Sequence, residues 1–329
     1  MFKYVMKAAA NSNEQLKDRF ESFRTLGIKP AIELYLSGSD DVFGPDRDAV
    51  EKNCRNFIEC EYMVHYPIMD TKTGYIYDGF DDESEKLEAV LDFTNEIGAG
   101  VLIMHCCYGF DRDISKREAF TKFLEKVGRW NDLAERRSLK ILLENYGFVW
   151  LPPGLKRDYV VSPIDHCFPW DMEWMHETMQ RKGLSSVAIL LDVAHAVLSS
   201  NMFNMRQRYG HLSEDGRFKN IYSEDLYRKD FLKASDFMFD FIDYFHVSDT
   251  FIWKPENGIG DMRKYLYTEN LPIGKGNVDF FEVLKKTKGN KTLVMEINPD
   301  NGDHTHNVSQ YQAVAWFKNN FNREELRCA

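Results

Sequence analysis

The sequence has no long uninterrupted run of apolar residues. No stretch of roughly 18 or more consecutive apolar residues occurs in the chain, and a helix that spans a membrane needs about that many. The first residues, MFKYVMKAAANSNEQ, also lack an apolar core after their lysines, which argues against a secretory signal. We therefore expect a cytoplasmic protein with no membrane partner.

Paired cysteines and an excess of positive charge are missing as well. The six cysteines form no CxxC pair, so no disulfide framework is indicated and the thiols are expected to stay reduced. The formal net charge is -10 at pH 7, which argues against a general nucleic-acid-binding surface. No linker, low-complexity stretch or internal repeat divides the 329 residues. We therefore expect one domain over residues 1–329.

What the sequence does contain is a series of short apolar segments bounded by polar or turn residues. Segments of this length fit strands that are buried on both faces. Eight strands are predicted, at Lys3–Lys7, Ala31–Leu36, Tyr62–Tyr66, Gly100–His105, Lys140–Asn145, Ser186–Asp192, Tyr244–Val247 and Lys291–Ile297.

Helical patterns lie between most of these segments. Apolar residues repeat at helical spacing in three of them, at Leu16, Phe20 and Phe23, at Leu87, Val90 and Leu91, and at Phe120, Phe123, Leu124 and Val127. Strand and helix in alternation predict a single (β/α)8 barrel, a TIM barrel of the α/β class. The alternative is an open, doubly wound sheet. Long connections follow the fifth, sixth and seventh strands, and in a barrel they belong to the catalytic face.

Residues of metal-binding type fall at or next to the ends of six of these strands. They are His65, His105, Glu144, Asp192, His246 and Glu296. A parallel barrel builds its active site from the C-terminal ends of its strands. Imidazole and carboxylate ligands together suit Zn, Mn or Co, whereas carboxylates alone favour Mg. We therefore predict a metalloenzyme with a divalent metal ion, Mn, Zn, Co or Mg, and we leave open whether it binds one ion or two.

The same segments resemble the xylose isomerase-like barrel superfamily, which includes endonuclease IV and many sugar and sugar-phosphate isomerases and epimerases. The resemblance rests on IELYLSG, MVHYP, LIMHCCYG, LLENYG, LLDVAHA, FHVSD, LPIGKGNVDF and VMEINP, which keep the family order from about residue 31 to 298. It implies that the single-metal set of the ketose epimerases corresponds to Glu144, Asp192, His246 and Glu296. His65 and His105 match histidines that endonuclease IV uses for a second zinc.

His195 matches a ligand of the third zinc of endonuclease IV. The family supplies the other third-site ligands as Asp-x-His shortly before its Gly-x-Gly turn. Here the segment from Thr268 to Gly274 reads TENLPIG and contains neither residue. A complete site for three zinc ions is therefore not expected.

The resemblance implies an isomerase or epimerase that acts on a small sugar or sugar phosphate. Glu144 and Glu296 would move a proton at the carbon next to a metal-bound carbonyl. His195 would hydrogen-bond a substrate oxygen, and Lys275, between Gly274 and Gly276, would meet a hydroxyl or phosphate. The aromatic residues of the long connections that are candidates to contact the substrate are Trp150, Trp170 and Trp253.

Two other functions stay open at this point. One is a phosphoester hydrolase with two zinc ions, in which all six ligands bind metal and Glu144 bridges the ions. The other is a related dehydratase or lyase, or a barrel that binds without turnover. A homo-oligomer is an expectation from the resemblance alone.

Overall fold

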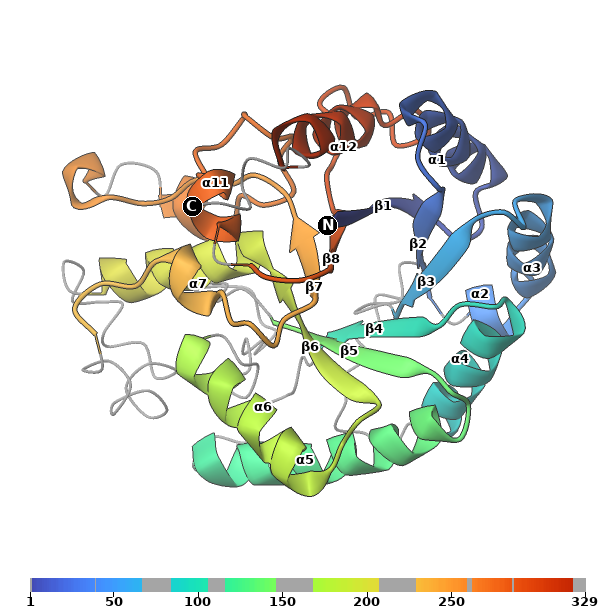
Figure 1. Ribbon diagram of the computed structural model, residues 1–329, viewed down its shortest axis with the longest axis horizontal. Helices are drawn as coiled ribbons and strands as arrows, with labels where there is room; N and C mark the ends of the chain where they lie inside the picture. Colours follow the sequence, from blue (N-terminus) through green and yellow to red (C-terminus); the bar gives the residue numbers. More distant parts are fainter. Residues whose placement is uncertain are drawn as a thin grey trace, which may run out of the picture.

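Eight parallel strands close into a barrel in the computed structural model (Figure 1). The structure describes residues 2–38, 40–66, 84–105, 116–145, 168–206, 229–258, 262–285 and 287–321. Each strand pairs with the next, and β8 pairs with β1, so the sheet has no edge. The strands are β1 (Phe2–Ala9), β2 (Ala31–Tyr35), β3 (Glu61–His65), β4 (Val101–His105), β5 (Lys140–Glu144), β6 (Val187–Asp192), β7 (Tyr244–Val247) and β8 (Lys291–Met295). The predicted barrel is confirmed, and the open sheet is excluded.

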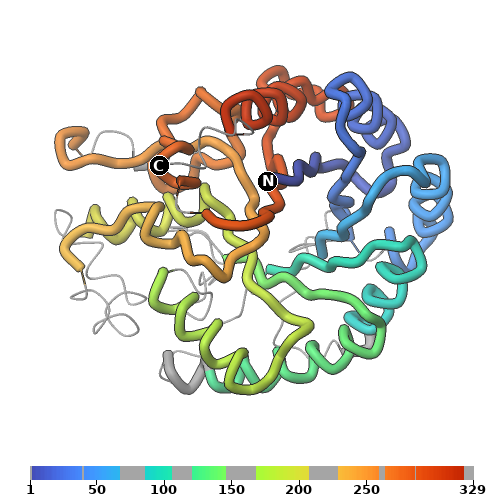
Figure 2. The backbone as a smooth tube through the Cα atoms, in the orientation of Figure 1, coloured from blue at the N-terminus to red at the C-terminus, as the bar shows by residue number. Residues whose placement is uncertain are grey.

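Helices surround the strands, and the tube trace shows how the chain alternates between the centre and the outer ring (Figure 2). The described helices are α1 (Asn13–Leu26), α2 (Asp40–Phe43), α3 (Arg47–Asn56), α4 (Ser84–Glu96), α5 (Lys116–Glu135), α6 (Pro169–Lys182), α7 (Val193–Met205), α10 (Met262–Leu266), α11 (Phe280–Leu284) and α12 (Val308–Phe321), with 3-10 turns η2 (Ala234–Phe237) and η3 (Pro255–Asn257). None of these helices is both long and apolar enough to cross a membrane.

The predicted helical stripes lie on α1, α4 and α5. Leu16 and Phe23 of α1 are fully buried, because their spacing turns them toward the strands. Ser12 caps the start of α1 by accepting from the backbone N–H of Gln15. Gly27 ends the helix in the left-handed region at φ 64°, where a glycine is favoured.

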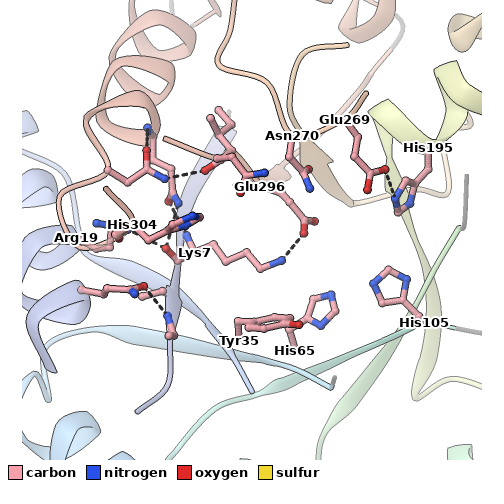
Figure 3. Close-up of a pocket in the computed structure, with 17 residues that line it drawn as sticks. Lys7, Arg19, Tyr35, His65, His105, His195, Glu269, Asn270, Glu296 and His304 are labelled. Carbon is pink, nitrogen blue, oxygen red and sulfur yellow. Dashed lines mark hydrogen bonds and ion pairs between the residues drawn. The ribbon is translucent and has the colours of Figure 1, made fainter. Parts of the chain in front are cut away.

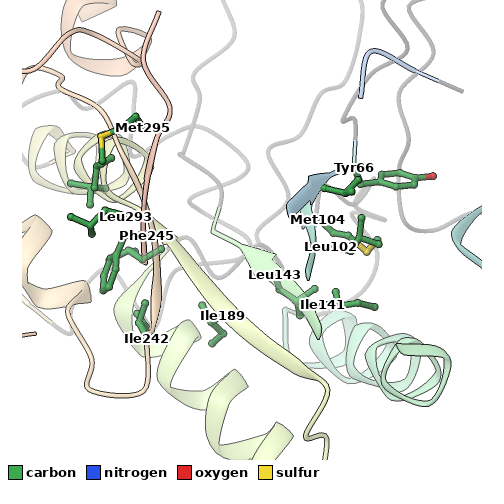
Figure 4. Packing of buried hydrophobic residues seen from close by; sticks show 14 of the residues in the cluster. Tyr66, Leu102, Met104, Ile141, Leu143, Ile189, Ile242, Phe245, Leu293 and Met295 are labelled. Carbon is green, nitrogen blue, oxygen red and sulfur yellow. The ribbon is translucent and has the colours of Figure 1, made fainter. Parts of the chain in front are cut away.

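Two apolar layers hold the barrel together. The outer layer lies between the sheet and the helices, and it includes Leu102, Ile141, Ile189, Phe245 and Leu293 (Figure 4). The inner layer fills the barrel itself and consists of Val5, Ala31, Met63, Ile103, Leu142, Leu190 and Val294, with Tyr244 packed against it. Because side chains alternate along a strand, the two layers come from alternate positions of the same strands.

This alternation also positions the polar residues of the barrel. The residue two positions beyond each inner-layer residue points the same way, toward the barrel axis. In seven strands this position carries a polar group, and after β8 it falls on Glu296, one residue beyond the end of the strand. In chain order these groups are Lys7, Glu33, His65, His105, Glu144, Asp192, His246 and Glu296. The apolar inner layer therefore forms the floor of a site to which each strand contributes one side chain.

Candidate metal centre

Glu144 lies at the centre of the polar cluster and is completely buried. Its Oε2 atom is 3.2 Å from His65 Nε2 and 3.3 Å from His105 Nε2. Its Oε1 atom is 3.1 Å from His246 Nδ1 and 3.7 Å from His195 Nδ1. Four imidazoles on different strands and on α7 thus converge on a single carboxylate.

His246 joins Glu144 to two further carboxylates. Its Nδ1 atom is 2.5 Å from Glu296 Oε2 and 4.0 Å from Asp192 Oδ2. Two sets of potential ligand atoms result, each with all its atoms within 4.8 Å of one another. One set is His65, His105 and Glu144, and the other is Glu144, Asp192, His246 and Glu296. The structure brings together all six residues that the sequence predicts as metal ligands, and Glu144 belongs to both sets.

The chemistry of these donors fits a divalent cation. Glu144 and Asp192 are at most 1% exposed, and a buried carboxylate is costly unless a cation or hydrogen-bond donors compensate it. Mixed imidazole and carboxylate donors suit Zn, Mn or Co better than Mg. The four-residue set holds three carboxylates and one imidazole, so it can take an ion with positions left for a substrate.

Burial and nearby charges shift the pKa values of the carboxyl groups in different directions. Burial raises the pKa of Asp192 to about 7. Burial alone would also raise the pKa of Glu144, but the charge of His246 and the hydrogen bonds from His246 and His65 hold it well below its usual value. For Glu296 the opposing burial is outweighed by Lys7 and His246, which keep its pKa low. Glu144 and Glu296 are therefore held in the charged form more firmly than Asp192.

The pKa values of the imidazoles are also shifted in different directions. Burial lowers the pKa of His105 to about 3, so that ring stays neutral. Burial opposes the charged form of His246 too, but the carboxylates around it raise its pKa well above the ordinary value. The pKa of His195 is raised likewise, because Asp192 and Glu269 outweigh its burial. A neutral ring such as that of His105 is the form that binds a metal.

A cavity of about 410 Å³ opens on one side of the cluster (Figure 3). Its wall includes Lys7, His105, His195, Glu269 and Glu296. Glu144, Asp192 and His246 are not among the lining residues and lie beneath it. Among the described residues, the carboxylates that line the cavity are Glu296 and Glu269, whereas the sequence suggests Glu144 and Glu296 as the pair beside the substrate.

Lys7 and Glu33 complete the cluster, and sequence reasoning assigned neither of them a role. The Lys7 ammonium forms an ion pair with Glu296 and lies 3.9 Å from Glu33 Oε1. Burial would lower the pKa of Lys7, but attraction to these two carboxylates raises it above its ordinary value. The sequence does indicate these two positions, because each is a charged residue at an inward position of a strand.

Glu269 is a third residue that sequence reasoning missed. Its Oε2 atom is 3.2 Å from His195 Nε2, and the other ring nitrogen of His195 is 2.8 Å from the carbonyl oxygen of Asn145. The segment before Gly274 lacks Asp-x-His, yet it still supplies one carboxylate to His195.

Three of the predicted substrate contacts, Trp170, Trp253 and Lys275, are not among the residues that line the cavity. Trp253 is 1% exposed and donates its indole N–H to the carbonyl of Gly258, so its ring packs the loop and has no face open to a substrate. Trp170 lies on α6 and stacks on Phe168, with ring centroids 5.0 Å apart. Lys275 is exposed at the rim and pairs with Asp300 at 2.8 Å. Trp150 lies outside the described residues.

Comparison with known proteins identifies the family of this barrel. Residues 14–320 match the model of the xylose isomerase-like TIM barrel family. The chain belongs to that family. Three solved structures of similar fold cover almost its whole length and almost all of their own. A search of curated protein sequences gives no significant match.

The IolI protein with a bound zinc atom has a TM-score of 0.59 at 14% identity, covering 98% of this chain and 100% of its own. D-psicose 3-epimerase in the presence of D-fructose has a TM-score of 0.54 at 11% identity, covering 96% of this chain and 98% of its own. An AP endonuclease of family 2 from Brucella melitensis has a TM-score of 0.53 at 12% identity, covering 97% and 99%. At these identities the similarity shows the barrel fold and not a reaction.

Proposed function

We propose that the protein is a divalent-metal-dependent isomerase or epimerase of a sugar or sugar phosphate. It would act by moving a proton at a carbon next to a carbonyl group. The observation that carries the proposal is the position of Glu296, which belongs to the four-residue ligand set and also faces the cavity. One carboxylate can therefore contact both a bound ion and a substrate.

The metal would be held by Glu144, Asp192, His246 and Glu296. When bound, such an ion polarises a carbonyl oxygen and makes the neighbouring C–H more acidic. The residues of the chain supply the remaining steps. Glu296 Oε1 or Oε2 would take the proton, and Lys7 beside it keeps that carboxylate charged at neutral pH.

Glu296 would return the proton to the substrate in the second half of the reaction, which regenerates the carboxylate. His195 and Glu269 line the same cavity and contact each other, so His195 would hydrogen-bond a substrate oxygen and Glu269 would orient the ring. Glu144 is fully buried beneath the cavity. We therefore propose it as a metal ligand and assign the proton transfer to Glu296.

The size of the cavity and the comparisons support a small polar substrate. A volume of about 410 Å³ lies at the lower end of the range for small-molecule sites, which is about 300–1,000 Å³. One structure of the same fold is a D-psicose 3-epimerase and another binds zinc. A monosaccharide or its phosphate is the class of substrate that we propose.

Deuterium exchange tests this proposal even though the product is not identified. The protein is loaded with Mn²⁺, Co²⁺ or Zn²⁺ and incubated in D₂O with a panel of ketoses, aldoses and their phosphates. We expect NMR to detect deuterium at one carbon next to a carbonyl, and Glu296→Gln to abolish the exchange. A matched control is Glu282→Gln, which removes a carboxylate that is 43% exposed and lies on α11. No exchange with any sugar under any metal would contradict the proposal.

A phosphoester hydrolase with two metal ions is the second candidate. The observation that favours it is the set of His65, His105 and Glu144, which shares Glu144 with the first set. Two adjacent ions bridged by a carboxylate are typical of enzymes that hydrolyse phosphoesters. Two zinc ions per chain together with hydrolysis of bis-p-nitrophenyl phosphate, lost in His105→Gln, would favour this function over proton transfer.

A further inference from the structure

The two ring nitrogens of His246 meet different partners inside the barrel. Nδ1 faces the ligand set, at 3.1 Å from Glu144 and 2.5 Å from Glu296. Nε2 points away from that set and lies 2.9 Å from Glu33 Oε2. Both His246 and Glu33 are 0% exposed, so water does not compete for either nitrogen.

We propose that Glu33 is a positioning residue that fixes the tautomer and the ring orientation of His246, so that Nδ1 is the nitrogen that binds metal. This inference rests on the metal centre of the proposed function. A carboxylate only accepts hydrogen bonds, so Nε2 must carry the proton that it donates to Glu33. Without a metal ion, Nδ1 also donates to carboxylates, those of Glu144 and Glu296. An ion held by those carboxylates would replace the proton on Nδ1, whereas the proton on Nε2 would stay with Glu33. Such a carboxylate also makes the ring a stronger electron donor.

The fold makes this contact possible across the barrel interior. Glu33 comes from β2, whereas His246 comes from β7, and these strands are separated by β8 and β1 in the sheet. Both residues occupy inward positions just above the inner apolar layer. The contact therefore requires that both residues point inward at the same height in the barrel. A carboxylate at the position before or after Glu33 would point toward the helices.

Lys7 forms a long ion pair with the second oxygen of Glu33, at a distance beyond that of a hydrogen bond. Lys7 and Glu33 are register partners on β1 and β2, and the ammonium is 3.9 Å from Glu33 Oε1. The same ammonium pairs with Glu296, so Glu33 is linked to the ligand set through both His246 and Lys7. An apolar residue would fill this interior position without a desolvation cost. Packing alone therefore does not explain why a carboxylate lies at this position.

Metal affinity measures the role of Glu33 directly. Zn²⁺ and Mn²⁺ binding is measured by competition with a chromogenic chelator for the wild type, Glu33→Leu and Glu33→Gln. We expect Glu33→Leu to weaken binding on the order of 10–100-fold, as the loss of an outer-shell carboxylate does. Glu33→Gln keeps an oxygen that can accept from Nε2, so it should recover part of the affinity. Asp41→Asn, a buried carboxylate near the end of β2 that bonds Ser37 and Asn11, controls for the loss of a buried charge.

Spectroscopy provides a readout that does not depend on a variant folding. Wild-type protein with ¹⁵N-labelled histidine is loaded with ¹¹³Cd²⁺, and the coupling between cadmium and the ring nitrogens of His246 is measured. We expect coupling to Nδ1 and a retained proton on Nε2. Coupling to Nε2, or equal metal affinity of the wild type and Glu33→Leu, would overturn the inference. If the wild type binds no metal, the proposed function itself fails, which distinguishes the two cases.

Discussion

The carboxylate of Asp249 ties the Gly-x-Gly turn to the chain just after β7, and its replacement by asparagine tests that role. Oδ2 accepts from the backbone N–H of Gly274 at 2.8 Å and of Gly276 at 3.0 Å. Oδ1 accepts from the N–H of Thr250 at 2.9 Å and of Val278 at 3.1 Å. Asparagine has one oxygen, so in either orientation its NH₂ group would face two N–H donors.

The magnitude follows from these contacts. Asp249 is 2% exposed, so water cannot replace the lost acceptor. A hydrogen bond to a charged group contributes about 1.5–3 kcal/mol, and two are lost. Asp249→Asn should therefore lower the free energy of unfolding by roughly 3–6 kcal/mol. The backbone of Asp249 also pairs with Leu271, close in the chain to Glu269, so the contact between Glu269 and His195 should loosen as well.

Urea unfolding followed by circular dichroism measures this change. The matched control is Asp300→Asn, which makes the same chemical change on a side chain that is 60% exposed and pairs with Lys275. That variant should stay within about 0.5 kcal/mol of the wild type. If Asp249→Asn proves as stable as the control, the four backbone amides do not depend on the carboxylate and the reasoning is refuted.

Three further predictions concern the barrel and its loops. Trp253→Ala should lower the free energy of unfolding, measured with urea, by about 3–5 kcal/mol, because the ring is 1% exposed. A decrease of less than about 1 kcal/mol would mean that the ring is not part of the core. Arg19→Lys should cost about 2–4 kcal/mol, because lysine cannot reproduce the fork that bonds the carbonyls of His304 and Thr305; an unchanged urea midpoint would contradict this. Burial raises the pKa of Cys54 to about 12 and of Cys60 to about 11. In the unfolded chain these thiols ionise near pH 9. Their contribution to the free energy of unfolding should therefore be constant below about pH 9 and should decrease as the pH rises toward 11–12. Urea unfolding at about pH 8 and about pH 10 checks this, and a Cys54→Ala, Cys60→Ala variant with the same decline would exclude these thiols as its cause.

The strands and six of the cluster residues could be predicted because two signals coincide in this sequence. A short apolar run predicts each strand. The alternation of side chains along that strand then predicts which polar residue near its C-terminal end points into the barrel. The predicted bounds differ from the observed ones by a residue or two, as at β8, predicted to Ile297 and observed to Met295. Local pattern is sufficient here because every strand obeys the same period of two.

The rest of the site depends on contacts between segments far apart in the sequence. Glu33 is one polar residue within IELYLSG, and nothing nearby in the sequence indicates that it meets His246 from β7. Lys7 is not a metal-ligand type, so a search for ligands passes over it, and its importance comes from Glu296 just after the last strand. Trp253 is a reasonable candidate for the substrate face, because sequence does not reveal whether a loop aromatic points into the cavity or into the core.

The number of divalent ions bound per chain is the sharpest test of the metal centre. Protein purified without chelator, and Glu144→Gln beside it, would be analysed by elemental mass spectrometry, with the matched exposed change Glu282→Gln as control. Because Glu144 belongs to both ligand sets, we expect at least one Mn, Co, Zn or Mg per wild-type chain and its loss or weakening in Glu144→Gln alone. A wild-type protein that binds no metal even after reconstitution, or a Glu144→Gln variant that binds as much as the wild type, would contradict the metal centre.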